Sequence, residues 1–189
     1  MDENQTEEPW HSSLEKYVKN IRDIARLHSN LHEQSGYYFK QRNNWFGLPS
    51  VLIPLIMAPI SLLVESANVS AIPFVNAGGF MLTGIFTGVY SFFKYGEQME
   101  RHFSFASRYS DIVTDIESEL IRERKHRTPA DVMIVKIKMA LANLNTTAPV
   151  IPPRIVSENK KTNTNIVYEP IEINISETDS DIAKKLISN

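Results

Sequence analysis

Several features are missing from this sequence, and each absence narrows the class of protein it encodes. Cysteine does not occur among the 189 residues, so no disulfide framework holds the fold, in agreement with a reducing compartment for most of the chain. Phosphate-binding glycine loops, nucleophile elbows and kinase motifs are also missing, and we expect no enzymatic activity, no cofactor and no metal. The net charge is −2, and the sequence has no basic stripe with interleaved aromatics. Both features argue against nucleic-acid binding.

Histidine is scarce and scattered, with one close pair, His28 and His32. Their i, i+4 spacing places both on one helix face, and two imidazoles at that spacing can hold a divalent metal. A third ligand and a general base are missing from the pattern. Histidines at the surface or between helices are therefore the favoured interpretation.

Charge is missing from two long stretches in the first half of the chain. Between Arg42 and Glu65 lie 22 uncharged residues, and between Glu65 and Lys94 another 28. A helix that crosses a hydrocarbon core about 30 Å thick needs roughly 20 mostly apolar residues. The sequence therefore predicts two membrane spans, at 45–64 and 71–93. The alternative, a buried hairpin in a soluble bundle, would need several covering helices, and the rest of the chain offers about three.

Apolar residues recur at helical spacing on both sides of these spans. They predict amphipathic helices at 13–44, 94–125 and 129–145, with Thr128 as N-cap of the last. The fold class is thus an all-α integral membrane protein, in which a two-helix transmembrane hairpin lies between long amphipathic cytoplasmic helices. The domain covers 13–153.

The two ends of the chain are polar. We expect the lead, 1–12, and the tail, 154–189, to be mostly disordered. Within the tail, 165–176 alternates Ile with polar residues, which favours an edge strand or a short linear motif, and 181–188 favours a helical turn.

Aromatic and basic residues mark the ends of the spans, where amphipathic rings and snorkelling cations favour the headgroup level. Lys and Arg flank both outer ends, and the connecting loop has none. The positive-inside rule then predicts a multi-pass membrane protein with both termini in the cytoplasm. The predicted interfacial anchors are Tyr37, Tyr38, Lys40, Arg42, Trp45 and Lys94.

Three prolines interrupt the first span. Pro49 comes near its start, whereas Pro54 and Pro59 are interior and each removes a backbone hydrogen bond, which favours a kink. In lipid the freed carbonyls need partners from neighbouring helices, hydroxyls or water. This span is therefore expected to pack against protein.

The second span carries two unusual features. Gly84 and Gly88 form a small-xxx-small pair, which suits close packing within the hairpin or against another subunit. Asn76, Thr83 and Thr87 fall within a wedge of roughly 40° at 100° per residue. That face could line water if several copies assemble, or the threonines could bond back to their own helix carbonyls.

Three stretches resemble the SLATT family, the two-transmembrane domains associated with SMODS-type nucleotide synthases and SLOG sensor domains. They are IARLHSNLHEQSGYYFKQRNNWFGLPSVLIPLI (24–56), EQMERHFSFASRYSDIVTDIESEL (97–120) and APVIPP (148–153). The resemblance implies a pore-forming or membrane-perturbing effector of biological conflict systems, without enzymatic activity. It also suits a viral or eukaryotic member of the family.

Two functions follow as expectations. The first is an oligomeric pore or permeability effector, with the lipid bilayer and copies of itself as partners. The alternative is a structural membrane anchor or scaffold, whose tail at 154–189 docks a protein partner.

Overall fold

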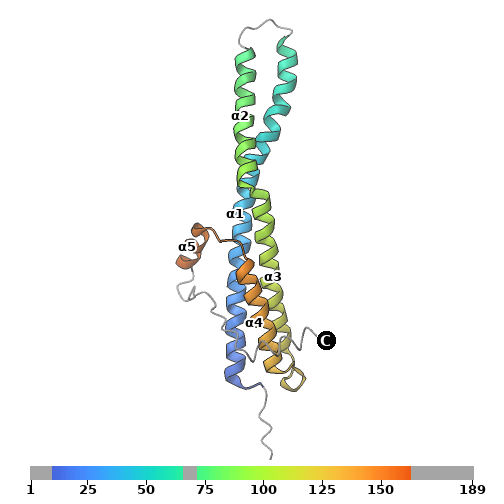
Figure 1. The fold of residues 1–189 in the computed structure, drawn as a ribbon, viewed down its shortest axis with the longest axis vertical. Helices are drawn as coiled ribbons and strands as arrows, with labels where there is room; N and C mark the ends of the chain where they lie inside the picture. Colours follow the sequence, from blue (N-terminus) through green and yellow to red (C-terminus); the bar gives the residue numbers. More distant parts are fainter. Residues whose placement is uncertain (1–9, 66–71, 163–189) are drawn as a thin grey trace, which may run out of the picture. The chain divides into compact units, whose positions relative to one another are not determined.

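Helices make up all of the regular structure in the described part of the chain. The computed structural model describes residues 10–65 and 72–162. Along the chain lie α1 (Ser12–Glu65), α2 (Ile72–Phe93), α3 (Tyr95–Ile121), the 3₁₀ helix η1 (Arg124–His126), α4 (Ala130–Thr147) and α5 (Pro153–Thr162) (Figure 1). The predicted all-α class is confirmed for these residues.

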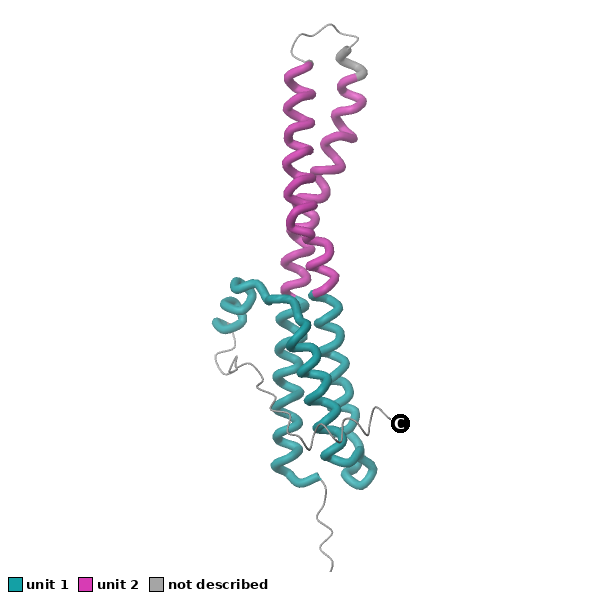
Figure 2. The backbone as a smooth tube through the Cα atoms, in the orientation of Figure 1, with its two compact units in different colours: residues 1–33, 102–189 teal, residues 34–101 magenta. Residues whose placement is uncertain are grey.

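The helices divide into two compact units (Figure 2). One unit, which we call the bundle, contains residues 10–33 and 102–162. The other, which we call the helix pair, lies within residues 34–101 and contains the second part of α1, α2 and the start of α3. The first part of α1 belongs to the bundle.

Apolar side chains of α1, α3 and α4 meet in the core of the bundle, where these helices run side by side (Figure 1). Each helix contributes residues at the i, i+3, i+4 spacing that the sequence shows. Burying one such large side chain stabilises the fold by about 1.5–3 kcal/mol. The core includes Val18, Ile21 and Ala25 of α1, Tyr109, Ile112 and Ile116 of α3, and Met133, Ile137, Leu141 and Leu144 of α4.

Trp10 closes one end of this core. Its side chain is buried, and its indole Nε1 donates a hydrogen bond of 2.9 Å to the Thr128 carbonyl. The guanidinium of Arg127 lies over the indole ring, and Arg127 and Arg124 both donate to the Glu15 carboxylate. Those hydrogen bonds, from Arg127 first, hold the pKa of Glu15 below its ordinary value. The predicted disorder of 1–12 is therefore wrong at Trp10, while residues 1–9 lie outside the described ranges.

The turn between α3 and α4 differs from its prediction in two places. α3 ends at Ile121, earlier than the predicted 125, because Arg127 donates to the carbonyls of Leu120 and Arg122. Thr128 is not the N-cap of α4, which begins at Ala130 after Pro129. Its N–H and hydroxyl instead donate to the Glu119 carboxylate at 3.1 and 3.2 Å, which binds the turn to α3.

α1 is one continuous helix of 54 residues, where the sequence predicted a helix at 13–44 followed by a span at 45–64. It stays helical through Pro49, Pro54 and Pro59. Local hydroxyls add bonds in this region: Ser50 Oγ donates to the Gly47 carbonyl at 2.7 Å, and Ser61 Oγ donates to the Met57 carbonyl at 2.8 Å. Helical backbone thus continues across the point where the side chains change from charged to apolar.

α2 packs against the second part of α1 in antiparallel fashion. Residues late in α1 contact the first half of α2, and earlier residues of α1 contact its second half. The contacts pair Ser61 with Asn76, Met57 with Gly79, Phe46 with Phe86, and Gly47 with Tyr90. Further on, Asn43 approaches Gly96 at the start of α3.

A single residue, Lys94, separates α2 from α3. Its φ of 46° is left-handed, a conformation that costs free energy for a residue other than glycine. The helical hydrogen bonds continue across it, from Lys94 N–H to the Tyr90 carbonyl and from Gln98 N–H to the Lys94 carbonyl. A cation here also suits the negative end of the α2 dipole.

The tail begins with a helix. α5 covers Pro153–Thr162 and has a buried side formed by Ile155 and Asn159, which are one turn apart. The prediction of disorder from 154 is therefore wrong for these residues. The predicted strand or linear motif at 165–176 and the helical turn at 181–188 lie outside the described residues.

The antiparallel contacts predict which engineered cysteines will join. A Cβ built at Gly79 lies 3.1 Å from Met57 Cγ, whereas one built at Gly84 meets nothing within 4 Å. A Met57→Cys/Gly79→Cys pair should therefore form a disulfide within one chain on mild oxidation. The control pair, Met57→Cys/Gly84→Cys, should not, and the chain has no native cysteine to interfere. Equal rates for the two pairs, read as mobility shifts under non-reducing conditions, would refute the register.

Candidate functional site

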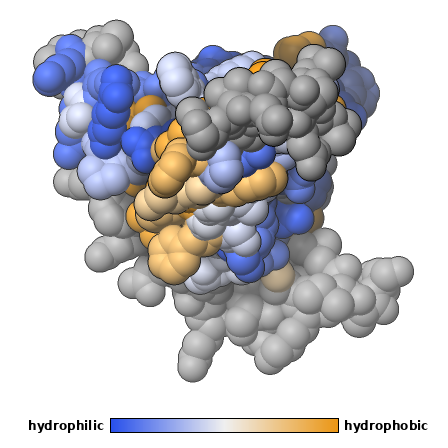
Figure 3. All heavy atoms as spheres, turned by 90° about the horizontal axis from the view of Figure 1, so that it is seen from above, coloured by the Kyte–Doolittle hydropathy of each residue, from blue (hydrophilic) through white to orange (hydrophobic). Residues whose placement is uncertain are grey.

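The outer surface of the helix pair is apolar. Among the described residues, all exposed large apolar or aromatic side chains except Tyr17, Ile121 and Val150 belong to this unit. Figure 3 shows apolar side chains gathered at the surface of the molecule. On α1 they are Leu48, Val51, Leu52, Leu55, Ile56 and Ile60, and on α2 they are Phe74, Val75, Phe80, Met81, Leu82, Ile85, Phe92 and Phe93.

Small and polar residues lie on the inner face of the helix pair. The Ser61 hydroxyl lies 2.8 Å from both Asn76 Oδ1 and the Met57 carbonyl, so its single proton is shared between the two acceptors, and Gly79 lets Met57 approach α2. Gly47 does the same for Tyr90, since a Cβ at Gly47 would lie 3.1 Å from the Tyr90 ring. The interior of the pair is thus mixed, with Phe46, Met57 and Phe86 beside the Ser61–Asn76 bond, whereas most of its large apolar side chains are exposed outside, unlike those of a water-soluble protein.

The predicted water-lining residues do not form one outward face. Asn76 and Thr83 are half-buried, and Asn76 faces α1 through its bond with Ser61. Thr83 Oγ1 donates to the Gly79 carbonyl at 2.9 Å, the back-bonding arrangement. Thr87 alone of the three is exposed. In the single chain α1 therefore contacts part of the predicted face, and a water-lining role for these residues in an assembly stays a prediction.

Gly84 and Gly88 do not have one of the two roles predicted for them, close packing within the hairpin. A Cβ at either position meets nothing within 4 Å, so neither glycine permits close packing within the helix pair. Gly47 and Gly79 have that role instead. Contact with another subunit through Gly84 and Gly88 stays a prediction.

The predicted interfacial anchors lie where the apolar surface ends. Trp45 is 70% exposed, the Arg42 guanidinium lies 4.3 Å from the Tyr38 ring centroid, and Lys40 Nζ lies 6.0 Å from that of Tyr37. Such cation–aromatic contacts keep the charged ends beside the rings. On the partner helix, exposed Lys94 follows Tyr90, at the same level.

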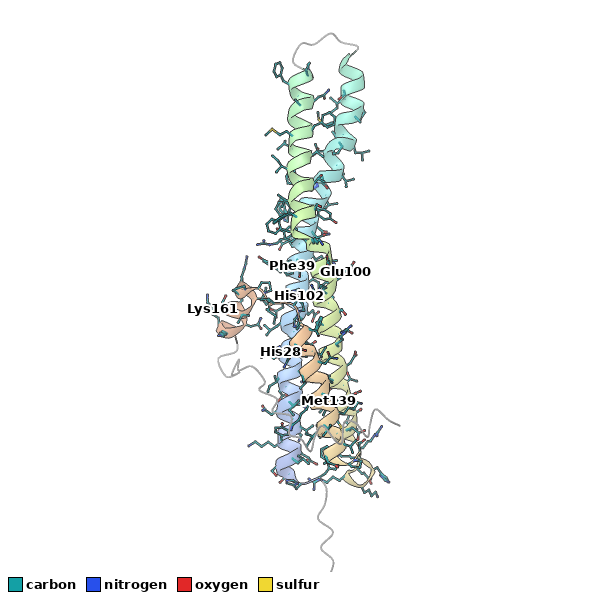
Figure 4. The ribbon with its side chains drawn as sticks, in the orientation of Figure 1. His28, Phe39, Glu100, His102, Met139 and Lys161 are labelled. Atoms are coloured by element: carbon teal, nitrogen blue, oxygen red, sulfur yellow. The ribbon has the colours of Figure 1, made fainter. Side chains whose placement is uncertain are left out.

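The bundle contains a buried histidine pair that the sequence did not reveal. His32 Nδ1 and His102 Nδ1 are 3.0 Å apart, so one ring donates to the other. The side chains of His32 and His102 are both buried. His32 stacks on Tyr109, and so does His28, which is half-buried. Figure 4 labels His28 on α1 and His102 on α3. The inter-helix interpretation of His28 and His32 agrees with this packing, but the partner, 70 residues away from His32, was missed.

Burial governs the protonation of this cluster. It lowers the pKa of His32 to about 4, with further contributions from His102 and then His28, and it lowers the pKa of His28. Burial also raises the pKa of Tyr109 to about 12, and the Tyr109 hydroxyl donates to Asn145 Oδ1 at 2.8 Å. Within the described ranges, no three His, Cys, Asp or Glu side chains are placed to hold a metal ion. His28 and His32 therefore pack as neutral rings near pH 7.

Taken together, the described residues define an all-helical protein in which one helix, α1, is long and apolar enough to cross a membrane. Its apolar window is not buried at all in the structure. α2 (Ile72–Phe93) has 22 residues, and none of them is charged. Comparison with protein-family models, curated proteins and solved structures finds no match.

The buried histidines predict acid sensitivity. The pKa of His32 is about 4 in the folded chain against an ordinary 6.5, so the unfolded state binds more protons between these values. The contribution of His32 to stability is complete above pH 6.5 and is lost as the pH falls toward 4, by about 1.4 kcal/mol per unit of pKa difference. We expect the thermal midpoint in detergent to fall over this range.

His32→Gln should flatten this part of the pH profile. His126→Gln, which changes an exposed histidine outside the cluster, is the matched control and should keep the wild-type profile. A His32→Gln profile parallel to that of the wild type would contradict the assignment.

Proposed function

We propose that the chain is a two-span integral membrane protein in which the helix pair crosses the bilayer and the bundle stands in the cytoplasm. The observation that carries this proposal is the distribution of side chains on the helix pair. Large apolar side chains are exposed on the outside, and Ser61 and Asn76 bond to each other on the inside. Such packing through small residues and inter-helix hydrogen bonds is typical of membrane helices, because lipid solvates the outer apolar groups.

The free-energy cost of exposing the helix pair to water supports the same proposal. In water each large exposed apolar side chain forfeits about 1.5–3 kcal/mol of burial. An apolar surface formed by the exposed side chains of two neighbouring helices is rare on soluble monomers. The core helix of a soluble protein also passes a test of length and hydropathy, but such a helix is mostly buried, and the apolar window of α1 is not.

Charge supports the proposed orientation. Lys40, Arg42 and Lys94 border the apolar surface at the end where the anchors lie, and the segment between α1 and α2 has no Lys or Arg. Both termini would then be cytoplasmic under the positive-inside rule.

Within this class we propose a non-enzymatic anchor or scaffold. The hairpin would hold the bundle at the membrane, and the region from α5 onward, 154–189, would dock a protein partner. The packing of Asn76 and Thr83 against α1 favours this role, because a single hairpin then offers little polar surface from which copies could build a pore.

The second candidate is the oligomeric pore or membrane-perturbing effector that the SLATT resemblance implies. Three exposed residues of α2 favour it. Gly84 and Gly88 leave a face open to a neighbouring helix, and Thr87 offers a hydroxyl on the outside of the helix pair.

Extraction and labelling test membrane insertion. We expect the protein to stay in the pellet after carbonate treatment, because the outer face of the pair is solvated by acyl chains. In sealed right-side-out vesicles, Ser70→Cys, between the two spans, should react with an impermeant maleimide. Val150→Cys, which is 89% exposed in the bundle, should react only after lysis. Release by carbonate, or equal labelling of both sites before lysis, would reject the proposal.

Conductance separates the two candidates. The scaffold role predicts that purified protein in planar bilayers passes no current above the lipid background. The pore role predicts currents that Thr87→Leu reduces and that Thr114→Leu, an exposed threonine of the bundle, leaves unchanged. Currents that follow this pattern, together with crosslinked oligomers, would replace the scaffold by the pore.

A further inference from the structure

A groove of about 230 Å³ lies in the helix pair, at the level where charged residues give way to apolar ones. Its lining comes from one stretch of α1 and one residue of α2: Asn43, Asn44, Gly47, Leu48, Ser50, Val51 and Tyr90. Gly47 contributes to this space, because any larger residue there would press on the Tyr90 ring at 3.1 Å.

The groove lining has a polar end and an apolar end, as a lipid molecule has. Asn43 and Asn44 supply amide groups toward the charged end of α1, while Leu48 and Val51 supply an apolar wall toward the other end. The Ser50 hydroxyl is already used by the Gly47 carbonyl. The groove thus offers polar contacts and apolar contacts at its two ends, with hydrogen-bond donors in the amides.

Two lysines border the polar end. Lys40 precedes Asn44 by one helical turn, so both lie on the same face of α1. Lys94 follows Tyr90 by one turn, its N–H bonds to the Tyr90 carbonyl, and its ammonium lies 3.8 Å from the exposed Glu97 carboxylate. Arg42, by contrast, is turned about 160° from Lys40 around α1 at 100° per residue, and lies over Tyr38.

Lys40 also differs from the cations of the bundle. Arg124, Arg127 and Lys136 of the bundle form ion pairs with carboxylates. In the part of the chain that the structure describes, Lys40 contacts the Tyr37 ring and has no carboxylate within ion-pairing distance. Its charge is available to an anion outside the protein.

We propose that this groove binds one phospholipid with an anionic headgroup. The inference rests on the proposed membrane insertion. The phosphate lies at Lys40 and Lys94, the amides of Asn43 and Asn44 donate to phosphate or ester oxygens, and an acyl chain follows Leu48 and Val51. A helix from a second copy would cover the same apolar wall but would leave Lys40 without an anion, which favours the lipid as occupant.

Lipid binding can be counted by native mass spectrometry of the purified protein in detergent. Phosphatidylglycerol is the anionic probe, phosphatidylcholine the zwitterionic probe, and glycerol phosphate the headgroup without chains. We expect one phosphatidylglycerol per chain, bound roughly tenfold more tightly than phosphatidylcholine. Lys40 contributes roughly fivefold, the effect of one basic residue near a headgroup, and Lys94, whose charge Glu97 partly offsets, contributes about twofold. Glycerol phosphate should not bind, because the chain contacts are lost.

Matched variants separate a site from diffuse surface charge. Lys40→Gln should lower phosphatidylglycerol affinity roughly fivefold, while Arg42→Gln, with the same charge change on the opposite face, should leave it unchanged. Gly47→Val should block both lipids, whereas Gly78→Val, at a position open within 4 Å, should not. The Met57→Cys/Gly79→Cys crosslink reports whether the helix pair is intact in each variant.

Equal losses in Lys40→Gln and Arg42→Gln, or a lipid count without a defined stoichiometry, would overturn the groove while leaving membrane insertion in place. Carbonate extraction of the same preparations tests insertion separately. Protein that is released by carbonate would overturn both the groove and the proposed function.

Discussion

The contact between α1 and α2 determines how the rest of this protein is interpreted. These helices approach each other through Gly47 and Gly79 and join through the Ser61–Asn76 hydrogen bond, while Asn43 Oδ1 is buried without a hydrogen-bond partner among the described residues. Once the inner faces are used in this way, every large apolar side chain outside must find another solvent. In the proposed insertion a bilayer supplies that solvent, and the exposed cations and aromatic rings at one end of the apolar surface match its headgroup region.

In the bundle, by contrast, apolar side chains are buried inside and most charged side chains lie outside. Its apolar residues are buried, its end is closed by Trp10, and the charges around Trp10 are paired among Glu15, Arg124 and Arg127. α1 supplies residues to both units, with an apolar stripe toward the bundle core in its first part and an apolar exterior in its second part. Under the proposed insertion one continuous helix would contact both water and lipid, and its side-chain chemistry changes between Arg42 and Trp45.

Much of this architecture could be predicted from the sequence because it depends on local patterns. Helical periodicity and the two uncharged runs correctly predicted helices around 45–64 and 71–93. The role of the aromatic and basic residues at their ends as interfacial anchors stays a prediction. The joining of 13–44 to 45–64 into one helix was not predicted, since Pro49 favours a helix start. The order at Trp10 and at 153–162 was also missed, because it comes from tertiary contacts that polar composition does not reveal.

The candidate sites were harder to predict, since they depend on which face meets which neighbour. The wedge of Asn76, Thr83 and Thr87 was visible in α2, but a single helix does not show that α1 covers part of it. The His32–His102 contact and the groove at Gly47 both join residues far apart in sequence. No spacing rule within one helix identifies such pairs.

Collision accessibility of spin labels tests the central claim most directly. Labels at Leu55→Cys and Phe80→Cys, both on the outer face of the helix pair, would be compared in lipid vesicles with a label at Val150→Cys in the bundle. The account predicts that the first two collide with oxygen and are shielded from a water-soluble nickel complex, while the third meets the nickel complex freely. Free access of the nickel complex to residues 55 and 80 would contradict it.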